Sequence, residues 1–160
     1  MTDVPGAPRI STEISRTSGT VISRELQNSG NPLLNSPRFK VSLTAEQTLP
    51  LGRWGSITAR YDGTWTDTSY YDATKGRGIP NTENIQFLPE ETIGQPAFWL
   101  HNLRLSYRLP DDRMEIAGWV RNLTDTPYKT FAFDASTFNN TSIYFVGDPR
   151  TIGASVVIHY

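Results

Sequence analysis

The chain has 160 residues, 37% of them hydrophobic, and its 15 Lys and Arg against 16 Asp and Glu give a formal net charge of −1. This length fits one domain or a piece of one, and the near-zero charge predicts no nucleic-acid partner. The lack of cysteine excludes disulfides and thiolate zinc sites, and a mean hydropathy of −0.43 without an apolar run near the roughly 18 residues of a helical span excludes a transmembrane helix.

Residues 1–37 are polar and follow no sustained period. We interpret them as an N-terminal loop segment with a frayed strand around residues 19–26. The first ten residues have neither a basic start nor an apolar run, so they predict no secretory signal. An exported protein would need such a signal, so if the strands that follow belong to one, we expect the chain to be an internal or truncated piece of a longer protein.

Two strands with alternating apolar and polar residues are predicted next, over 38–49 and 56–67, with a short turn between them. A period of two places alternate residues on opposite faces of a sheet. The apolar faces comprise Phe39, Val41, Leu43 and Ala45 in the first strand and Ile57, Ala59, Tyr61, Gly63 and Trp65 in the second. The charged residues Glu46, Arg60 and Asp62 fall on the opposite face.

Residues 68–96 form a long polar stretch without periodicity, which predicts a loop with a flexible tip at Lys75–Gly78. Strands are predicted again at 98–109 and 114–122, joined by the tight polar turn at 110–113. Their apolar faces comprise Trp99, Leu103, Leu105, Tyr107 and Leu109, with His101 as a polar intruder, and Met114, Ile116, Gly118 and Val120. Shifting the first of them by one residue would turn Arg104 and Arg108 to the apolar side.

A second long segment, 123–149, is rich in aromatic residues and precedes a final strand that starts near Arg150. This last strand places Ile152, Ala154, Val156, Ile158 and Tyr160 on one face. About ten alternating residues at a tilt suffice to cross an outer membrane, and an apolar face ending in an aromatic residue is typical of a barrel strand.

Short and long connections alternate along the five predicted strands, as in outer-membrane barrels with short periplasmic turns and long extracellular loops. We therefore predict an all-β fold: an antiparallel transmembrane β-barrel segment in the bacterial outer membrane, with the C-terminus in the periplasm. Its apolar face would contact the lipid bilayer. The alternatives are a small autonomous outer-membrane barrel or pore and a soluble all-β binding module.

Three stretches resemble the C-terminal barrel region of TonB-dependent outer-membrane receptors. They are GNPLLNSPRFKVSLTAEQTLPLG (30–52), DDRMEIAGWVRNLTDTPYKTFAFD (111–134) and VGDPRTIGASVVIHY (146–160). The most specific pieces are Val120–Asp125 with Pro127–Tyr128, and Gly147–Arg150 before the aromatic-ended strand. The resemblance covers the chain from about Gly30 onward, so we divide the sequence into residues 1–37 and a barrel part, 38–160.

The resemblance implies that the chain supplies five to six strands of a barrel of about 22, whose lumen holds a plug. The implied activity is uptake of iron chelates (siderophores) or another scarce nutrient. The implied partners are the plug and remaining strands, the barrel-assembly machinery, and an energy-transducing inner-membrane protein acting through the plug. Val156, Ile158 and Tyr160 would form the assembly signal. An incomplete barrel leaves unpaired edges, so we expect the chain to be inactive alone.

Two groups of residues are candidates for ligand binding. Arg60, Arg104, Arg108 and Arg121 share the predicted lumenal face, where they would guide an anionic chelate or pair with plug carboxylates. In the last long segment, ligand contact and loop packing are equally compatible with Phe131, Phe133, Phe138 and Tyr144. By contrast, interfacial anchoring explains Trp54, Trp65, Trp99, Tyr61 and Tyr107 better than ligand stacking does.

The sequence predicts no enzyme activity, metal or cofactor. Glu90–Glu91 and Asp111–Asp112 are neighbours in loops or turns, without a partner at catalytic spacing. Neither His101 nor His159 has a second ligand at metal spacing.

Overall fold

The computed structural model describes residues 10–17, 20–27, 30–78, 88–135 and 141–159. The chain forms two structural units, one from residues 37–68, 96–129 and 146–160, and the other from residues 1–36, 69–95 and 130–145. The described elements are strands, apart from one short 3-10 helix, so the predicted all-β class is confirmed. No helix among the described residues is long and apolar enough to span a bilayer.

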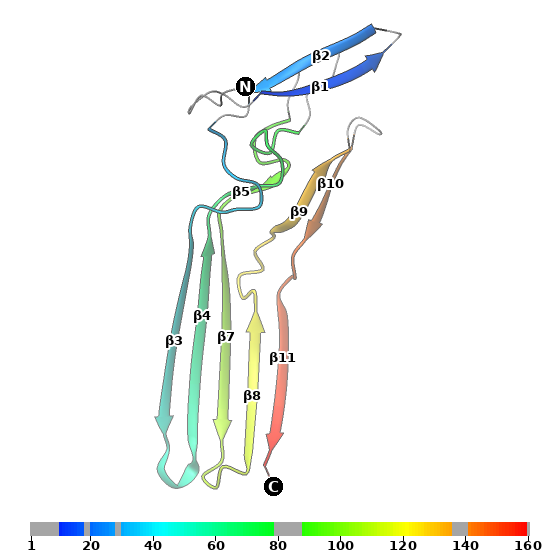
Figure 1. Cartoon of the computed structure of the whole chain (residues 1–160). Coiled ribbons are helices and arrows are strands. Elements are labelled where there is room, and N and C mark those ends of the chain that lie inside the picture. Colours follow the sequence, from blue (N-terminus) through cyan, green and yellow to red (C-terminus); the bar gives the residue numbers. More distant parts are fainter. Residues whose placement is uncertain (1–9, 18–19, 28–29, 79–87, 136–140, 160) are drawn as a thin grey trace. The chain divides into compact units, whose positions relative to one another are not determined.

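A five-stranded antiparallel sheet dominates the first of these units (Figure 1). Its strands are β3 (Lys40–Pro50), β4 (Ser56–Thr66), β7 (Phe98–Arg108), β8 (Met114–Arg121) and β11 (Thr151–Ile158), and they lie in this order across the sheet. All five predicted strands are therefore confirmed to within two residues at the described ends. The sheet is open, with β3 and β11 at its edges.

The short connections lie at one end of this sheet and the long ones at the other, as predicted (Figure 1). The β3–β4 connection contains the 3-10 helix η1 (Gly52–Trp54), and the Tyr107 hydroxyl anchors it by donating to the Trp54 carbonyl at 2.6 Å. In the β7–β8 turn Asp112 has a φ of 55°, a left-handed conformation that Asp tolerates, and its N–H donates to the Leu109 carbonyl.

The second unit contains three short strand pairs: β1 (Ile10–Thr17) with β2 (Thr20–Gln27), β5 (Ser69–Tyr70) with β6 (Gly94–Gln95), and most of β9 (Lys129–Asp134) with β10 (Ser142–Val146). A strand around residues 19–26 was predicted, but its partner β1 was not. The boundary at residue 37 stays a prediction. The interpretation of 68–96 as loop alone is wrong, because β5 and β6 lie within it, and the segment 123–149 likewise contains β9 and β10.

The tip Lys75–Gly78, which we predicted to be flexible, is held in the structure by backbone hydrogen bonds to residues 88–93 and by the Asp72 carboxylate. Asp72 accepts hydrogen bonds from the backbone N–H groups of Thr74, Gly76 and Gly78 at 2.7 to 3.0 Å. The Ile93 side chain is buried, and the Ile93 N–H donates to the Gly76 carbonyl. One acidic side chain thus supplies three of the hydrogen bonds that order a turn without a periodic sequence pattern.

Candidate functional site

The register of the five-stranded sheet sorts its side chains by polarity. Across β3, β4 and β7 the pairs Val41–Trp65, Leu43–Gly63 and Ala59–Leu105 lie on one face. The same face continues through Leu105–Gly118 and Val156–Ile116 to β11. Leu105 and Val156 are 55% and 59% exposed, so this continuous apolar face is uncovered.

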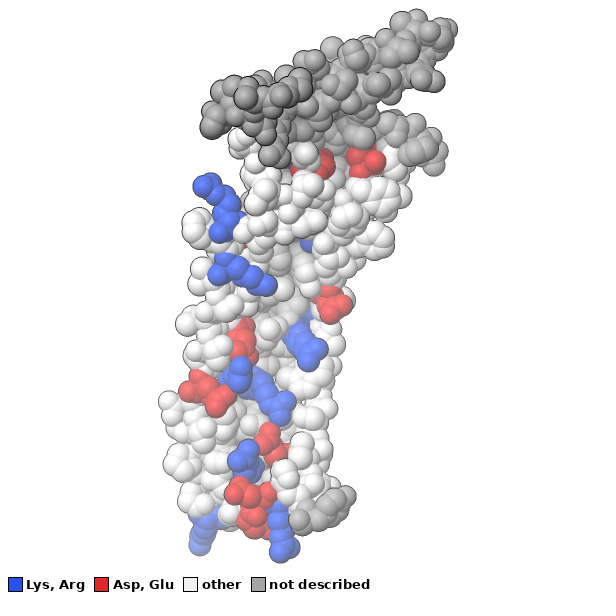
Figure 2. Space-filling model, in the orientation of Figure 1, with Lys and Arg blue, Asp and Glu red and all other residues white. Residues whose placement is uncertain are grey.

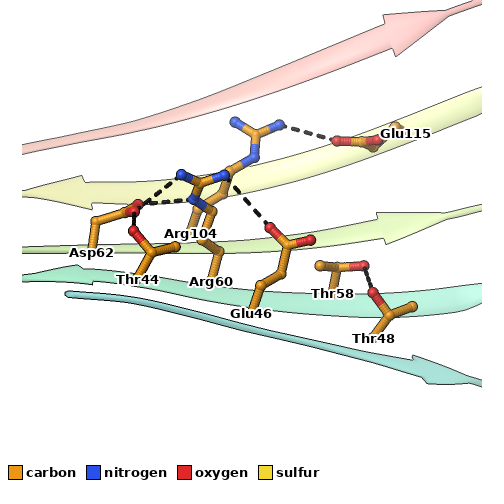
Figure 3. A network of polar contacts seen from close by, with 8 residues as sticks. All are labelled: Thr44, Glu46, Thr48, Thr58, Arg60, Asp62, Arg104 and Glu115. Atoms are coloured by element: carbon orange, nitrogen blue, oxygen red, sulfur yellow. Dashed lines mark hydrogen bonds and ion pairs between the residues drawn. The ribbon is translucent and has the colours of Figure 1, made fainter.

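The opposite face carries the charged side chains, which gather over the sheet with positive and negative groups side by side (Figure 2). One network joins β3 and β4 (Figure 3). The Arg60 guanidinium donates to both carboxylate oxygens of Asp62 at 3.0 and 3.1 Å, and it lies 3.6 Å from a Glu46 oxygen. Thr44 donates to Asp62 at 2.8 Å. Arg60 is therefore held by two carboxylates.

A second network joins β7 and β8. Glu115 accepts from Arg104 at 3.0 Å and from Arg108 at 2.9 Å. One carboxylate thus serves two guanidinium groups, although Arg108 also lies 4.0 Å from Asp112 in the turn. Arg60 and Arg104 are direct cross-strand neighbours. Like charges in such a pair repel, and the carboxylate on each side offsets that repulsion.

Arg121 differs from the other three arginines. Its guanidinium lies over the Trp119 ring, 5.0 Å from the centroid, and within the described ranges it forms no ion pair. The Trp119 ring in turn covers Gly153 on β11, and a Cβ at that position would overlap the ring. The glycine therefore lets the indole lie flat on the sheet and support Arg121.

A hollow of about 330 Å³ lies on this polar face between β4, β7 and β8. Its polar lining consists of Arg60, Asp62, Asn102, Arg104, Trp119 and Arg121. The Asn102 side-chain oxygen accepts from the backbone N–H of Asn122 at 3.0 Å. The hollow is therefore flanked by three guanidinium groups and one carboxylate, and that carboxylate is bonded to Arg60.

The aromatic residues predicted to contact ligand lie on β9 and β10. Phe131 packs against Tyr71, Phe133 and Phe145, with ring centroids 5.7, 6.2 and 6.4 Å away, and it remains 41% exposed. Burial raises the pKa of the Tyr71 hydroxyl above its ordinary value. Tyr144 is exposed, and Phe138 lies outside the described residues. Loop packing thus engages part of the group, and ligand contact stays a prediction.

The motif residues of the resemblance form a polar corner where β8 ends. Asn122 is almost fully buried, with a φ of 48°, and its side-chain amide donates to the Thr126 and Asp148 carbonyls and accepts from the Thr126 N–H. Asp125 accepts from the Arg150 N–H at 2.8 Å. The Tyr128 ring covers Gly147, leaving no room for a Cβ. Asn122 and Asp125 thus tie the end of β8 to the backbone of residues 126, 148 and 150.

His101 lies on the apolar face, as predicted, and is stacked between Trp99 and Tyr61. The Tyr61 hydroxyl and the His101 Nδ1 are 2.6 Å apart, so each polar group has a partner on a face that is otherwise apolar. Among the described residues no cluster of His, Asp and Glu is arranged to hold a metal ion.

The structure therefore brings the four predicted arginines to one face of the five-stranded sheet, whereas Phe131, Phe133 and Tyr144 belong to β9 and β10 of the other unit. The sequence placed Glu46 and Asp62 on that face, but it did not pair them, or Glu115, with the arginines. Pairing depends on cross-strand register, which the period of two does not specify. Val156 and Ile158 lie exposed on the apolar face and Tyr160 is outside the described residues, so the assembly signal stays a prediction.

An antiparallel sheet with one uncovered apolar face, one charged face, and long connections at a single end defines the class of transmembrane β-barrel segments. A sequence profile of the TonB dependent receptor-like β-barrel family matches residues 12–123, and the chain belongs to that family. Its members are outer-membrane receptors that transport solutes rather than catalyse reactions.

A solved structure supports the same fold. The ferric yersiniabactin uptake receptor FyuA from Yersinia pestis superposes with a TM-score of 0.62 at 19% sequence identity. The match covers 84% of this chain and 18% of that receptor, so the chain spans under a fifth of its length. A search of curated proteins gave no match.

Proposed function

We propose that the chain forms the C-terminal part of the wall of an outer-membrane receptor that takes up iron chelates (siderophores) or another scarce nutrient. The observation that carries this proposal is the sorted sheet. Its uncovered apolar face would contact lipid, and the opposite face, with Arg60, Arg104, Arg108 and Arg121, would line an aqueous lumen. Family membership and the likeness to FyuA, a ferric yersiniabactin uptake receptor, support it.

In this proposal the short β3–β4 and β7–β8 connections and the C-terminus face the periplasm, while the long segments face outward. The rest of the barrel pairs with the free edges of β3 and β11, which lipid cannot satisfy. A plug would fill the lumen and transmit the action of an energy-transducing inner-membrane partner, and the barrel-assembly machinery would insert the whole protein. The chain alone would transport nothing.

Because the chain has no native cysteine, single cysteines can report which face contacts lipid. We expect a polarity-sensitive dye on Leu105→Cys to report a lipid environment and the same dye on the adjacent Ser106→Cys to report water. Equal signals from the two sites would contradict the wall assignment. Orientation is tested with impermeant reagents on intact cells, which should label Lys75→Cys but leave Gly52→Cys unlabelled.

Transport requires a separate experiment. Deleting the codons for residues 98–159 from the gene that carries this sequence should abolish uptake of radioactive iron from at least one ferric chelate by iron-starved cells. A matched gene with Ser106→Thr should retain uptake. Unchanged uptake of every chelate offered, with normal growth on limiting nutrients, would contradict the transport proposal. The wall assignment would not be affected, because the dye experiment tests it separately.

A further inference from the structure

The four arginines of the polar face are unequally neutralised. Arg60 contacts Asp62 and Glu46, whereas Arg104 and Arg108 share Glu115. Within the described ranges Arg121 contacts no carboxylate. Positive charge is therefore left over on the β7 and β8 side of the hollow, next to Arg104 and Arg121.

The way in which Arg121 is held leaves its donors available. Stacking on an indole engages the face of the guanidinium, while its N–H groups lie in the plane of the group and point outward from its edges. Arg104 donates to Glu115 through one terminal nitrogen, and within the described residues Glu115 is its only side-chain partner. Two planar donors thus border one hollow, each fixed in place by a contact that leaves other N–H groups unused.

The chemistry of the lining selects the charge and shape of an occupant. A cation would meet three guanidinium groups and one carboxylate that is already bonded to Arg60. An anion would meet unused guanidinium donors, and a carboxylate matches their geometry because its two oxygens can accept parallel hydrogen bonds. The volume of about 330 Å³ accommodates the end of an acidic side chain or a small organic acid.

We propose that this hollow is a carboxylate-binding site in which Arg121 is the principal residue and Arg104 the second. The inference rests on the proposed function, because it requires the polar face to line a lumen. The carboxylate is supplied either by an acidic side chain of the polypeptide that fills the lumen or by a small anionic ligand. Gly153 is a positioning residue, since it allows Trp119 to lie beneath Arg121.

The test uses the full 160-residue chain in detergent micelles, with ¹⁵N-labelled arginine. The Nε–Hε signals are followed by NMR during titration with acetate, with citrate, and with a blocked Gly-Glu-Gly peptide. Matched additions are sodium chloride at equal ionic strength and the blocked Gly-Gln-Gly peptide. We expect the Arg121 and Arg104 signals to shift saturably with the carboxylates alone.

The chain offers a matched control in Arg53, which also stacks on an indole, with its guanidinium 5.0 Å from the Trp54 centroid, but lies in the turn away from the hollow. Replacing Arg121 by Gln should weaken carboxylate binding by about tenfold or more, because it removes charge-assisted hydrogen bonds. Arg53→Gln should change it by less than about twofold, in line with an exposed charge. Arg121→Lys keeps the charge but loses the planar fork, and should bind at an intermediate level.

The results distinguish between the two sources of the carboxylate, and they test the site and the wall assignment separately. Tighter binding of the Glu peptide than of citrate identifies a polypeptide as the source of the carboxylate, and the reverse identifies a small ligand. Equal shifts with chloride, or equal losses in Arg121→Gln and Arg53→Gln, would overturn the site. Absent shifts, in a chain whose Leu105→Cys dye reports an apolar environment, would overturn the site alone. Loss of the dye contrast between Leu105→Cys and Ser106→Cys would overturn the wall assignment together with the site that depends on it.

Discussion

The five-stranded sheet and the segments that join its strands at the long-connection end are specified in different ways. In the sheet, period-two alternation alone places Leu105 on one face and Arg104 on the other, and many weak preferences act in the same direction. In the segment after β4, one carboxylate, Asp72, orders a turn through three backbone hydrogen bonds. Distributed patterns tolerate single polar changes on the water-facing side, whereas a local turn depends on individual atoms.

The largest effect should come from reversing polarity in the sheet. Leu105→Arg and Val156→Arg each place a charge on the uncovered apolar face, at about 2 to 4 kcal/mol near the bilayer midplane. We expect both to block membrane assembly, measured as heat-modifiable receptor in outer-membrane fractions. The adjacent Ser106→Arg and Ser155→Arg should be tolerated, and equal tolerance at all four sites would remove the lipid-facing assignment.

A smaller loss is expected at the corner where β8 ends. Asn122→Ala removes three side-chain hydrogen bonds at a nearly buried position and leaves backbone groups without partners. The free energy of unfolding should fall by about 1 to 3 kcal/mol. Urea titration in micelles measures this, with the exposed Thr124→Ala as the matched change. If both variants unfold at the same urea concentration, the corner does not stabilise the sheet.

The contact between Trp119 and Gly153 can be tested with a double-mutant cycle. Gly153→Val forces a side chain into the space of the indole and should cost about 1 to 3 kcal/mol. Trp119→Ala removes the ring, so the valine should then cost much less, and the coupling should exceed about 0.5 kcal/mol. Additive losses would show that the overlap is relieved elsewhere.

Asp72→Ala should have the smallest effect on the stability of the sheet, but a large effect on its own loop. Freeing three backbone N–H groups should open the loop, so that trypsin cleaves after Lys75 and Arg77 several times faster than in the unchanged chain. The urea midpoint of the sheet should stay the same. A shifted midpoint with unchanged cleavage would show that the carboxylate acts on the sheet and not on its own loop. Asp148→Ala, outside this loop, serves as the control.

The sequence predicted the structure best in the five-stranded sheet. Alternation predicted the strands around Leu43, Leu105 and Val156, and the side chains that share each face, because lipid on one side and water on the other select that period. β9 and β10 were not predicted, because the alternating run around Phe131 and Phe133 is too short to distinguish a strand from a loop. The alternation placed the four arginines on one face, but the residues that pair with them depend on the cross-strand register. The support of Arg121 by Trp119 depends on the space that Gly153 leaves open.

The parity of the strand count limits what can complete the sheet. Since each of the five neighbouring strands reverses direction, β3 and β11 run the same way. Two such sheets joined edge to edge in a common membrane orientation would meet as parallel strands, so copies of this sheet cannot close an antiparallel ring. Closure requires an odd number of additional strands, which makes the missing partner a different sheet with complementary ends. The number and direction of the strands in this sheet therefore determine that the polypeptide which completes an antiparallel ring contributes an odd number of strands.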